Sequence, residues 1–369
     1  MINSVLKFVF FIIFIYFWYR ALFNNENRVI YNMPEHFADK YGEGSSNKHC
    51  KLNKKELLVH NINLDEEINI TSVENENFDV HVGGHWSPND CLPYQKVAVI
   101  LPYRHREHHL HTLLKRLHPM LKKQKIHYTI FIITQIGEQE FNRGLILNIG
   151  VLEAMKLTDF DCIIFNDVDL VPESDSNLYF CDNGVRQISS AIDDTRYHVM
   201  FWNNAGGVVS ISTDNYFKIN GHPNVYWGWG NEDDDFSIRT KLSNLKLSRP
   251  YEHIGRFKMV KHLRGFRNTE AYWLFLSFRG RWPHDGLNSL MKVSNQIDID
   301  QFVNGNQTMI KQKNKYIPFK TPYQLLKVTR HKLYTNISVR VKKLKNANLH
   351  KFLYTWESWN WFLSFYGWI

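Results

Sequence analysis

The sequence predicts an α/β fold with a parallel sheet at its centre. Three short apolar runs, rich in β-branched and aromatic residues, predict buried strands, and two segments with helical apolar spacing lie between them. Such strand–helix–strand–helix–strand alternation is typical of the nucleotide-binding α/β class. The chain has 369 residues, of which 44% are hydrophobic, so it can form one large or two ordinary domains with a full core.

The predicted elements in chain order are a strand over residues 96–104, a helix over 108–122, a strand over 128–133, a helix over 145–155 and a strand over 161–170. The first helix is indicated by leucines at 110, 113, 114, 117 and 121. The chain contains no G-x-G-x-x-G and no Walker loop, so neither a dinucleotide fold nor a P-loop enzyme is favoured.

Two carboxylates, Asp167 and Asp169, lie at the end of the third predicted strand. In an open α/β sheet, ligands bind beyond the carboxyl ends of the strands. Carboxylates that alternate along such an edge suit a hard divalent cation and leave coordination positions open for phosphate oxygens. The alternative is that the two residues only cap the next element.

A second segment with candidate functional residues combines Trp227-Gly228-Trp229-Gly230 with the acids Glu232, Asp233, Asp234 and Asp235. A carboxylate beside an aromatic wall is a common arrangement for holding a sugar, since the ring faces stack and the acid accepts hydroxyl protons. The glycines allow a loop to change shape over bound substrate. An acidic helix N-terminus explains the four acids equally well, but not the Trp-Gly-Trp-Gly run.

The N-terminus carries a nearly continuous apolar run over residues 5–23. Its length is close to the roughly 20 residues of a membrane-spanning helix, and Tyr16, Trp18 and Tyr19 are suitable interfacial anchors. We expect an uncleaved signal anchor after a short tail (residues 1–4), followed by a polar stem over 24–48. A cleaved signal peptide is the alternative. Four cysteines permit two disulfides in an oxidising compartment.

The formal net charge of +9 comes from one segment. Residues 301–351 contain 12 Lys and Arg and no Asp or Glu, and the rest of the chain is slightly acidic. A basic face spread over the domain is therefore not indicated, and nucleic acid is excluded as a partner. The aromatic tail that follows, residues 346–369, is expected to pack on the domain or to contact an anionic membrane surface.

Seven motifs over residues 95–290 resemble those of the β1,4-galactosyltransferase family (glycosyltransferase family 7), in that family's order. They are Pro102-Tyr103-Arg104-His105-Arg106, Phe141-Asn142-Arg143, Asp167-Val168-Asp169, Gly206-Gly207-Val208, Trp227-Gly228-Trp229-Gly230 with the following acids, Met259-Val260-Lys261-His262 and Asp285-Gly286-Leu287-Asn288-Ser289-Leu290. A chance match to all seven is implausible. The resemblance implies a type II Golgi membrane enzyme with a luminal domain of the GT-A-like nucleotide-sugar-binding class, whose sheet is mixed and largely parallel.

The resemblance also implies a role for each matched residue. The UDP-sugar would be held by Pro102, Tyr103, Arg104, Arg106, Phe141, Arg143, Asp167, Val168, Asn204 and Gly207. Mn²⁺ would be held by Asp169, Met259 and His262, although a thioether is an unusual partner for a hard cation. Asp233 would be the general base, with Glu232 beside it, and Trp229 would fold over donor and acceptor. The implied disulfides are Cys50–Cys91 and Cys162–Cys181.

The expected reaction is inverting transfer of galactose from UDP-galactose to a terminal N-acetylglucosamine in β1,4 linkage on glycoprotein or glycolipid glycans. The identity of the donor sugar is left open by Asn204, which stands where many galactose-transferring relatives carry a bulky Tyr. A smaller residue at this position makes room for N-acetylgalactosamine. Xylose on proteoglycan linkers is an alternative acceptor. A catalytically inactive glycan-binding or UDP-sugar-binding descendant is a further alternative.

Two other departures from the family pattern concern the domain itself. Asn231 replaces the family's Gly before the acidic run, and residues 291–322 form an insertion of about thirty residues. The catalytic domain is expected to extend over residues 49–345.

Overall fold

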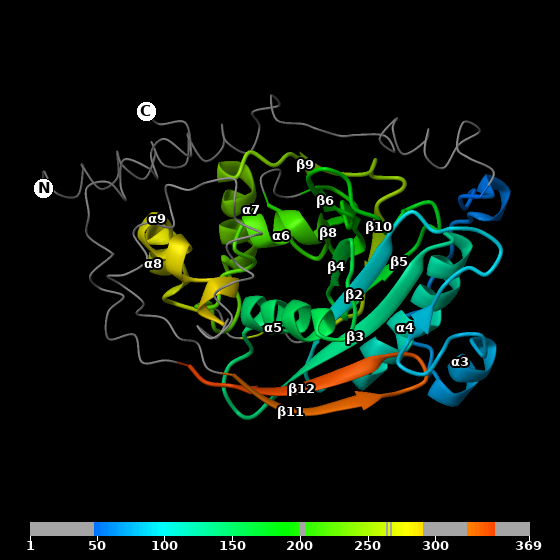
Figure 1. Cartoon of the computed structure of the whole chain (residues 1–369), viewed down its shortest axis with the longest axis horizontal. Helices are drawn as coiled ribbons and strands as arrows, with labels where there is room; N and C mark the ends of the chain where they lie inside the picture. The colour runs from blue at the N-terminus through cyan, green and yellow to red at the C-terminus, as the bar shows by residue number, and fades with distance from the viewer. Residues whose placement is uncertain (1–47, 200–203, 263–264, 266–267, 291–322, 344–369) are drawn as a thin grey trace, which may run out of the picture.

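The main sheet is long, mixed and built around parallel strands (Figure 1). The computed structural model describes residues 48–199, 204–262, 265, 268–290 and 323–343. The strands of this sheet are β1 (His85–Trp86), β2 (Lys96–Tyr103), β3 (His127–Ile136), β4 (Cys162–Asn166), β6 (Val185–Gln187), β8 (Val208–Ser212), β9 (Leu247–Ser248), β11 (Tyr323–Arg330) and β12 (Thr335–Val341).

The strand order is β11-β12-β3-β2-β4-β8-β6-β9, and β1 pairs with β3. The four neighbours β12, β3, β2 and β4 run parallel, whereas β8 is antiparallel to β4 and β11 is antiparallel to β12. The predicted α/β class with a mixed, largely parallel sheet is confirmed, and the parallel part lies at its centre.

The central strands are apolar along their whole length because both faces of the sheet are covered. In β2, Ala98 and Ile100 face the core formed with α5 (Arg143–Met155), whereas Val97, Val99 and Leu101 face the core formed with α4 (Glu107–Lys123). α5 approaches the sheet closely at Gly150, where a Cβ would stand 2.7 Å from Ile133 and 2.8 Å from Ile100. Both predicted helices are confirmed, with bounds shifted by one or two residues.

The predicted strand over residues 161–170 is wrong in its extent. β4 ends at Asn166, and a tight turn closes with a hydrogen bond of 3.0 Å from Leu170 N to Asp167 O. A separate strand, β5 (Leu170–Pro172), then joins β10 (Arg256–Met259) and β7 (Ala191–Ile192) in a small second sheet. The sequence lacks a glycine or proline at the turn, so the break between the two strands carries no strong turn signal.

The remaining helical segments surround these sheets. They are η2 (Lys54–Glu56), α3 (Ile70–Glu76), η3 (Asp193–Thr195), α6 (Thr213–Lys218), α7 (Glu232–Leu242), α8 (Ala271–Leu276), α9 (Phe278–Arg281), η4 (Trp282–His284) and η5 (Leu287–Ser289). Among the helices of the described ranges, none is both long and apolar enough to span a bilayer. The predicted span 5–23, nearly all of the stem, the insertion 291–322 and the tail 346–369 lie outside the described residues.

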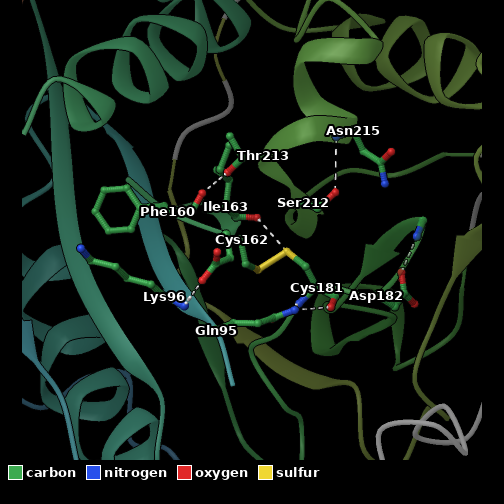
Figure 2. The surroundings of a disulfide bond; sticks show 12 residues. Gln95, Lys96, Phe160, Cys162, Ile163, Cys181, Asp182, Ser212, Thr213 and Asn215 are labelled. Atoms are coloured by element: carbon green, nitrogen blue, oxygen red, sulfur yellow. Dashed lines mark hydrogen bonds between the residues drawn. A yellow bond between two sulfur atoms is a disulfide. The ribbon is translucent and has the colours of Figure 1, made fainter. Parts of the chain in front are cut away.

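Both implied disulfides are confirmed. Cys50 bonds to Cys91, and Cys162 bonds to Cys181. Figure 2 shows the second bond, which joins the start of β4 to the segment before β6. The side chain of Gln95 holds the same segment, since it accepts from Cys181 N at 3.0 Å and donates to Cys181 O at 2.8 Å.

A buried ionic cluster ties α7 to the chain around α9. Arg239 Nε donates to Asp235 Oδ1 at 2.7 Å, and Arg239 Nη1 donates to Asp285 O at 2.7 Å. Arg281 donates to both Asp235 and Asp285. All four side chains are at most 1% exposed, so their two positive and two negative charges compensate each other in the interior.

We expect the substitution Arg281→Met to reduce the free energy of unfolding by about 3–5 kcal/mol, because it leaves two buried carboxylates with one guanidinium group. Urea denaturation measures the loss. Lys115→Met is the matched control, since Lys115 and Glu66 form an ion pair at the surface, and it should cost less than about 1 kcal/mol. Equal losses in the two variants would contradict this assignment.

Candidate functional site

The predicted site residues come together at the edge of the main sheet where β2 and β4 end. These strands are parallel, so their carboxyl ends, at Tyr103 and Asn166, point to the same edge. α5 begins there at Arg143, and contacts of this residue bring in the start of α7 at Glu232. Two strand ends and two helix N-termini therefore frame the site.

Arg143 joins carboxylates from two different elements. Its Nε donates to Asp167 Oδ1 at 2.6 Å, and its Nη1 donates to Asp233 Oδ1 at 2.9 Å. Its Nη2 donates to the carbonyl oxygen of Gly207 at 3.3 Å. The structure thus places four of the predicted site residues in one hydrogen-bonded group.

The position of Arg143 follows from the cap of α5. Asn142 is the N-cap residue, and its Oδ1 accepts from Leu145 N at 3.0 Å. Its Nδ2 donates to Asn224 O at 2.7 Å, which fastens the cap to the segment that leads to α7. Asn142 is fully buried, so this contact fixes the direction in which Arg143 leaves the helix.

The site holds more carboxylates than cations. Burial raises the pKa of Asp233 well above its ordinary value; the Arg143 charge opposes this shift, and Glu232, Asp167 and Asp234 reinforce it. Burial likewise raises the pKa of Glu232 and of Asp167. Such a cluster favours an additional cation or a neutral, protonated carboxyl group.

Of the three predicted metal ligands, Asp169 and His262 contact each other, and Met259 ends the strand that pairs with β5. His262 Nδ1 lies 3.2 Å from Asp169 Oδ2, and Arg106 Nη1 donates to the same oxygen at 3.0 Å. Val260 N donates to Asp169 O at 2.8 Å, and Met259 lies opposite Leu170 in the register of β10 and β5. The small second sheet therefore carries Met259 to the turn that holds Asp169.

The carboxylate of Asp169 and the imidazole of His262 are donor types that a divalent cation accepts. In an octahedral site with bonds of about 2.1 Å, neighbouring ligand atoms lie about 3 Å apart, which is close to the Asp169–His262 separation. No group of three His, Cys, Asp or Glu residues with metal-binding geometry occurs in the described part of the chain. The predicted set does not require one, because its third member is a methionine.

Further residues predicted to hold the UDP line the same edge. Pro102 is buried and Tyr103 is half-buried at the end of β2. The guanidinium group of Arg104 lies 5.4 Å from the ring centre of Phe141, and its Nη1 donates to Gln139 O at 2.6 Å. Arg104 and Phe141 form one cation–π pair at this end of the site.

Val168 and Trp227 belong to the matched motifs but have buried apolar side chains. Val168 is 3% exposed and packs in the core between α4 and the sheet, so it offers a ligand only its backbone. Trp227 is 4% exposed and belongs to the core on the α5 side, so it cannot form a sugar-binding wall. Trp229, in contrast, is 53% exposed. The predicted wall of two tryptophans is therefore wrong for Trp227.

The acidic run forms the first turn of α7, and its members differ in their surroundings. Asp235 belongs to the buried ionic cluster, so it is not a ligand contact. Asp234 accepts from Asn204 Nδ2 at 3.0 Å and from Asn231 Nδ2 at 3.3 Å. Asn231 has a φ of 67°, a conformation that Gly and Asn tolerate best, so Asn can occupy the family's glycine position.

Gly206 allows the carboxylate of Asp233 to lie against the backbone. A Cβ at this position would stand 2.3 Å from Asp233 Oδ2 and 3.1 Å from Asn204 Oδ1. The same carboxylate contacts Arg143, so Asp233 is held between this backbone segment and the guanidinium group. A side chain at position 206 would therefore collide with the Asp233 carboxylate, which explains the glycine in this motif.

Some residues that shape the site have no recognisable sequence signal. Arg249 Nη2 donates to Asn204 O at 2.6 Å, and Arg249 Nε donates to Gln187 Oε1 at 2.5 Å. Ser189 Oγ accepts from Val208 N at 2.8 Å and lies 3.4 Å from Gly206 O. Arg249 and Ser189 influence the site only through hydrogen bonds between segments that are distant in the sequence.

Two family descriptions match the chain. That of the N-terminal region of glycosyl transferase group 7 matches residues 50–182, and that of the N-terminal domain of galactosyltransferase matches residues 186–263. The catalytic domain of Drosophila β1,4-galactosyltransferase 7, solved in complex with xylobiose, is 23% identical with a TM-score of 0.46, and the match covers 70% of this chain and 99% of that one.

Curated relatives are more similar in sequence. β-1,4-Galactosyltransferase 2 of Cricetulus griseus is 40% identical over 275 residues, which are 73% of this chain and 66% of the relative. β-1,4-Galactosyltransferase 3 of Homo sapiens is 42% identical over 226 residues, which are 60% of this chain and 57% of the relative. The chain thus spans just under two thirds of the length of the first relative and less of the second. The resemblance stated from the motifs is confirmed: the chain belongs to glycosyltransferase group 7, the family of the β1,4-galactosyltransferases.

Proposed function

We propose that this protein is a Mn²⁺-dependent, inverting glycosyltransferase that moves galactose from UDP-galactose to a terminal N-acetylglucosamine in β1,4 linkage. One observation carries the proposal: Arg143 holds Asp233 and Asp167 in one group, and the turn that carries Asp167 also carries Asp169, which contacts His262. The proposed base, the proposed nucleotide-binding carboxylate and two of the proposed cation ligands are thereby adjacent, as a sugar-nucleotide reaction requires.

In the proposed reaction, different residues of the chain bind the donor and remove the acceptor proton. Arg104 and Phe141 bind the uridine end, and Asp167 and Arg143 orient the ribose and pyrophosphate. Asp169, Met259 and His262 would hold Mn²⁺, which would supply charge stabilisation for the departing diphosphate. Asp233 takes the proton of the acceptor hydroxyl as its oxygen bonds to the anomeric carbon, and UDP leaves with the electrons of the broken bond. A single displacement of this kind inverts the α-linked donor.

The acceptor is proposed to lie over exposed aromatic residues of the Trp229 loop and of α8. Trp229 O accepts from Asn268 N at 3.0 Å, so the loop tryptophan is joined to the segment that begins α8. Tyr272 and Trp273 of α8 are 46% and 48% exposed, and their rings contact each other. Exposed aromatic rings of this kind suit the apolar face of a pyranose ring. Glycoprotein or glycolipid glycans ending in N-acetylglucosamine are the proposed acceptors.

The donor alternative, UDP-N-acetylgalactosamine, has one observation in its favour. Asn204 is small and is held by Asp234 at 3.0 Å, next to the carboxylate of Asp233. The larger side chain found in many galactose-transferring relatives would fill this space, and its absence leaves room for an acetamido group.

We propose that the protein is a single-pass type II Golgi membrane protein with its catalytic domain in the lumen. The proposed parts of the chain are a cytoplasmic tail (1–4), a membrane anchor (5–23), a stem (24–48), a catalytic domain (49–345) and a C-terminal tail (346–369). Both pairs of cysteines form disulfides, which suits an oxidising compartment.

A transfer assay with Mn²⁺, an N-acetylglucosamine acceptor and the two donors in competition tests the proposal. We expect galactose transfer, its loss on adding EDTA, and a drop in kcat of about 100-fold or more in Asp233→Asn, because the base is removed while the UDP contacts remain. Asp214→Asn, an exposed acid on α6, is the control. Preferred transfer of N-acetylgalactosamine would change the donor; transfer that survives EDTA or Asp233→Asn would contradict the mechanism.

The pH dependence of kcat/KM should reflect the raised pKa of Asp233. The base acts only when ionised, so activity falls as the pH falls through this pKa, which burial holds above its ordinary value of 3.8. Arg143→Gln removes the opposing positive charge, so the acidic limb should move to higher pH.

Arg104→Gln is the matched control for this profile, because Arg104 contacts Phe141 and Gln139 rather than Asp233. It should weaken donor binding and leave the acidic limb in place. If the acidic limb of the Arg143→Gln profile does not move, or moves to lower pH, Asp233 is ruled out as the titrating base.

A further inference from the structure

The two carboxylates of the Asp-Val-Asp motif lie on one tight turn between β4 and β5. Asp167 O accepts from Leu170 N at 3.0 Å, which closes the turn. Asp169 O accepts from Val260 N at 2.8 Å, which fastens the turn to β10 on one side. The direction of both carboxylates therefore depends on the backbone of four residues.

The other side of the turn is held by one buried side chain, that of Asn166. Its Nδ2 donates to Asp167 O at 2.8 Å and to Leu170 O at 3.2 Å. Its Oδ1 accepts from Tyr179 Oη at 2.7 Å. Only the amide nitrogen can donate to the two carbonyl oxygens, so this orientation of the amide is fixed.

Tyr179 is in turn held by rigid surroundings. It is fully buried, and its backbone nitrogen donates to Gln124 Oε1 at 3.0 Å. It stands two positions before Cys181, whose disulfide to Cys162 joins the start of β4 (Figure 2). β4 is thus tied to the same segment at its start, by the disulfide, and at its end, by the Tyr179–Asn166 hydrogen bond.

From this geometry we infer that Tyr179 and Asn166 form a positioning pair, which fixes the Asp167–Asp169 turn so that it binds the diphosphate of the nucleotide together with its divalent cation. Neither side chain reaches the site, because both are fully buried. They act through the backbone of the turn, as outer residues do when they orient the ligands of a metal or anion. The inference rests on the proposed function and deepens it.

Tyr179→Phe tests the pair because it removes one hydroxyl group and keeps the ring in the core. We expect the Kd for UDP in the presence of Mn²⁺, measured by calorimetry on the full chain, to rise about tenfold, and kcat to change less. Amide exchange at Leu170 N should become faster, because the turn loses its support.

Tyr216→Phe is the matched control. Tyr216 is also fully buried, and its hydroxyl donates to Asn148 Oδ1 at 2.5 Å, away from the turn. It should destabilise the protein comparably and leave the UDP Kd within about twofold of wild type. Asn166→Ala should raise the Kd as Tyr179→Phe does, and the double variant should bind UDP like Asn166→Ala alone, because Tyr179 acts through Asn166.

The inference is overturned if Tyr179→Phe binds UDP as Tyr216→Phe does, or if the effects of Tyr179→Phe and Asn166→Ala multiply. If Asn166→Ala does not fold, the comparison of the two tyrosine variants decides. A wild-type protein that binds UDP but transfers no sugar would refute the proposed function, and the Kd values would still decide the inference. If it binds no UDP, the exchange rate at Leu170 N decides whether Tyr179 restrains the turn.

Discussion

The pairing of one guanidinium group with two carboxylates is the interaction on which the site depends. Arg143 contacts Asp167 at 2.6 Å and Asp233 at 2.9 Å, and these residues come from the end of β4 and the start of α7. Burial disfavours ionised carboxylates, so without this cation Asp167, Glu232 and Asp233 would repel each other in a poorly solvated space. The remaining excess of negative charge is the physical reason why a divalent cation is expected beside them.

Such a charged site requires a stiff frame, because a small displacement of any carboxylate changes every pairwise energy. The frame has three parts. The Asn142 cap fixes Arg143, the ionic cluster of Asp235, Arg239, Arg281 and Asp285 fixes α7, and the disulfide Cys162–Cys181 fixes β4. In contrast, Trp229 is 53% exposed, and it follows Gly228, whose φ of 80° is a conformation that favours glycine.

Much of this arrangement was predictable from the sequence, because buried parallel strands have a strong signal. β2 is apolar on both faces, and its residues alternate between two cores, so its prediction was secure. The turn at Asp167 was not recognised in the sequence, because it contains neither Gly nor Pro and is supported by the side chain of Asn166. Trp227 and Asp235 share their motif with Trp229 and Asp233, yet they belong to the interior. Local sequence cannot separate such neighbours, since their surroundings come from distant segments such as α5 and α9.

Anomalous scattering at the manganese edge, from crystals grown with UDP and Mn²⁺, tests the central claim most directly. We expect one peak within about 2.5 Å of the Asp169 carboxylate and the His262 imidazole, with the Met259 sulfur beside it and the UDP diphosphate completing the coordination. A peak at another group of carboxylates, or UDP bound at this edge with no peak, would contradict the assignment of these three residues as the cation site.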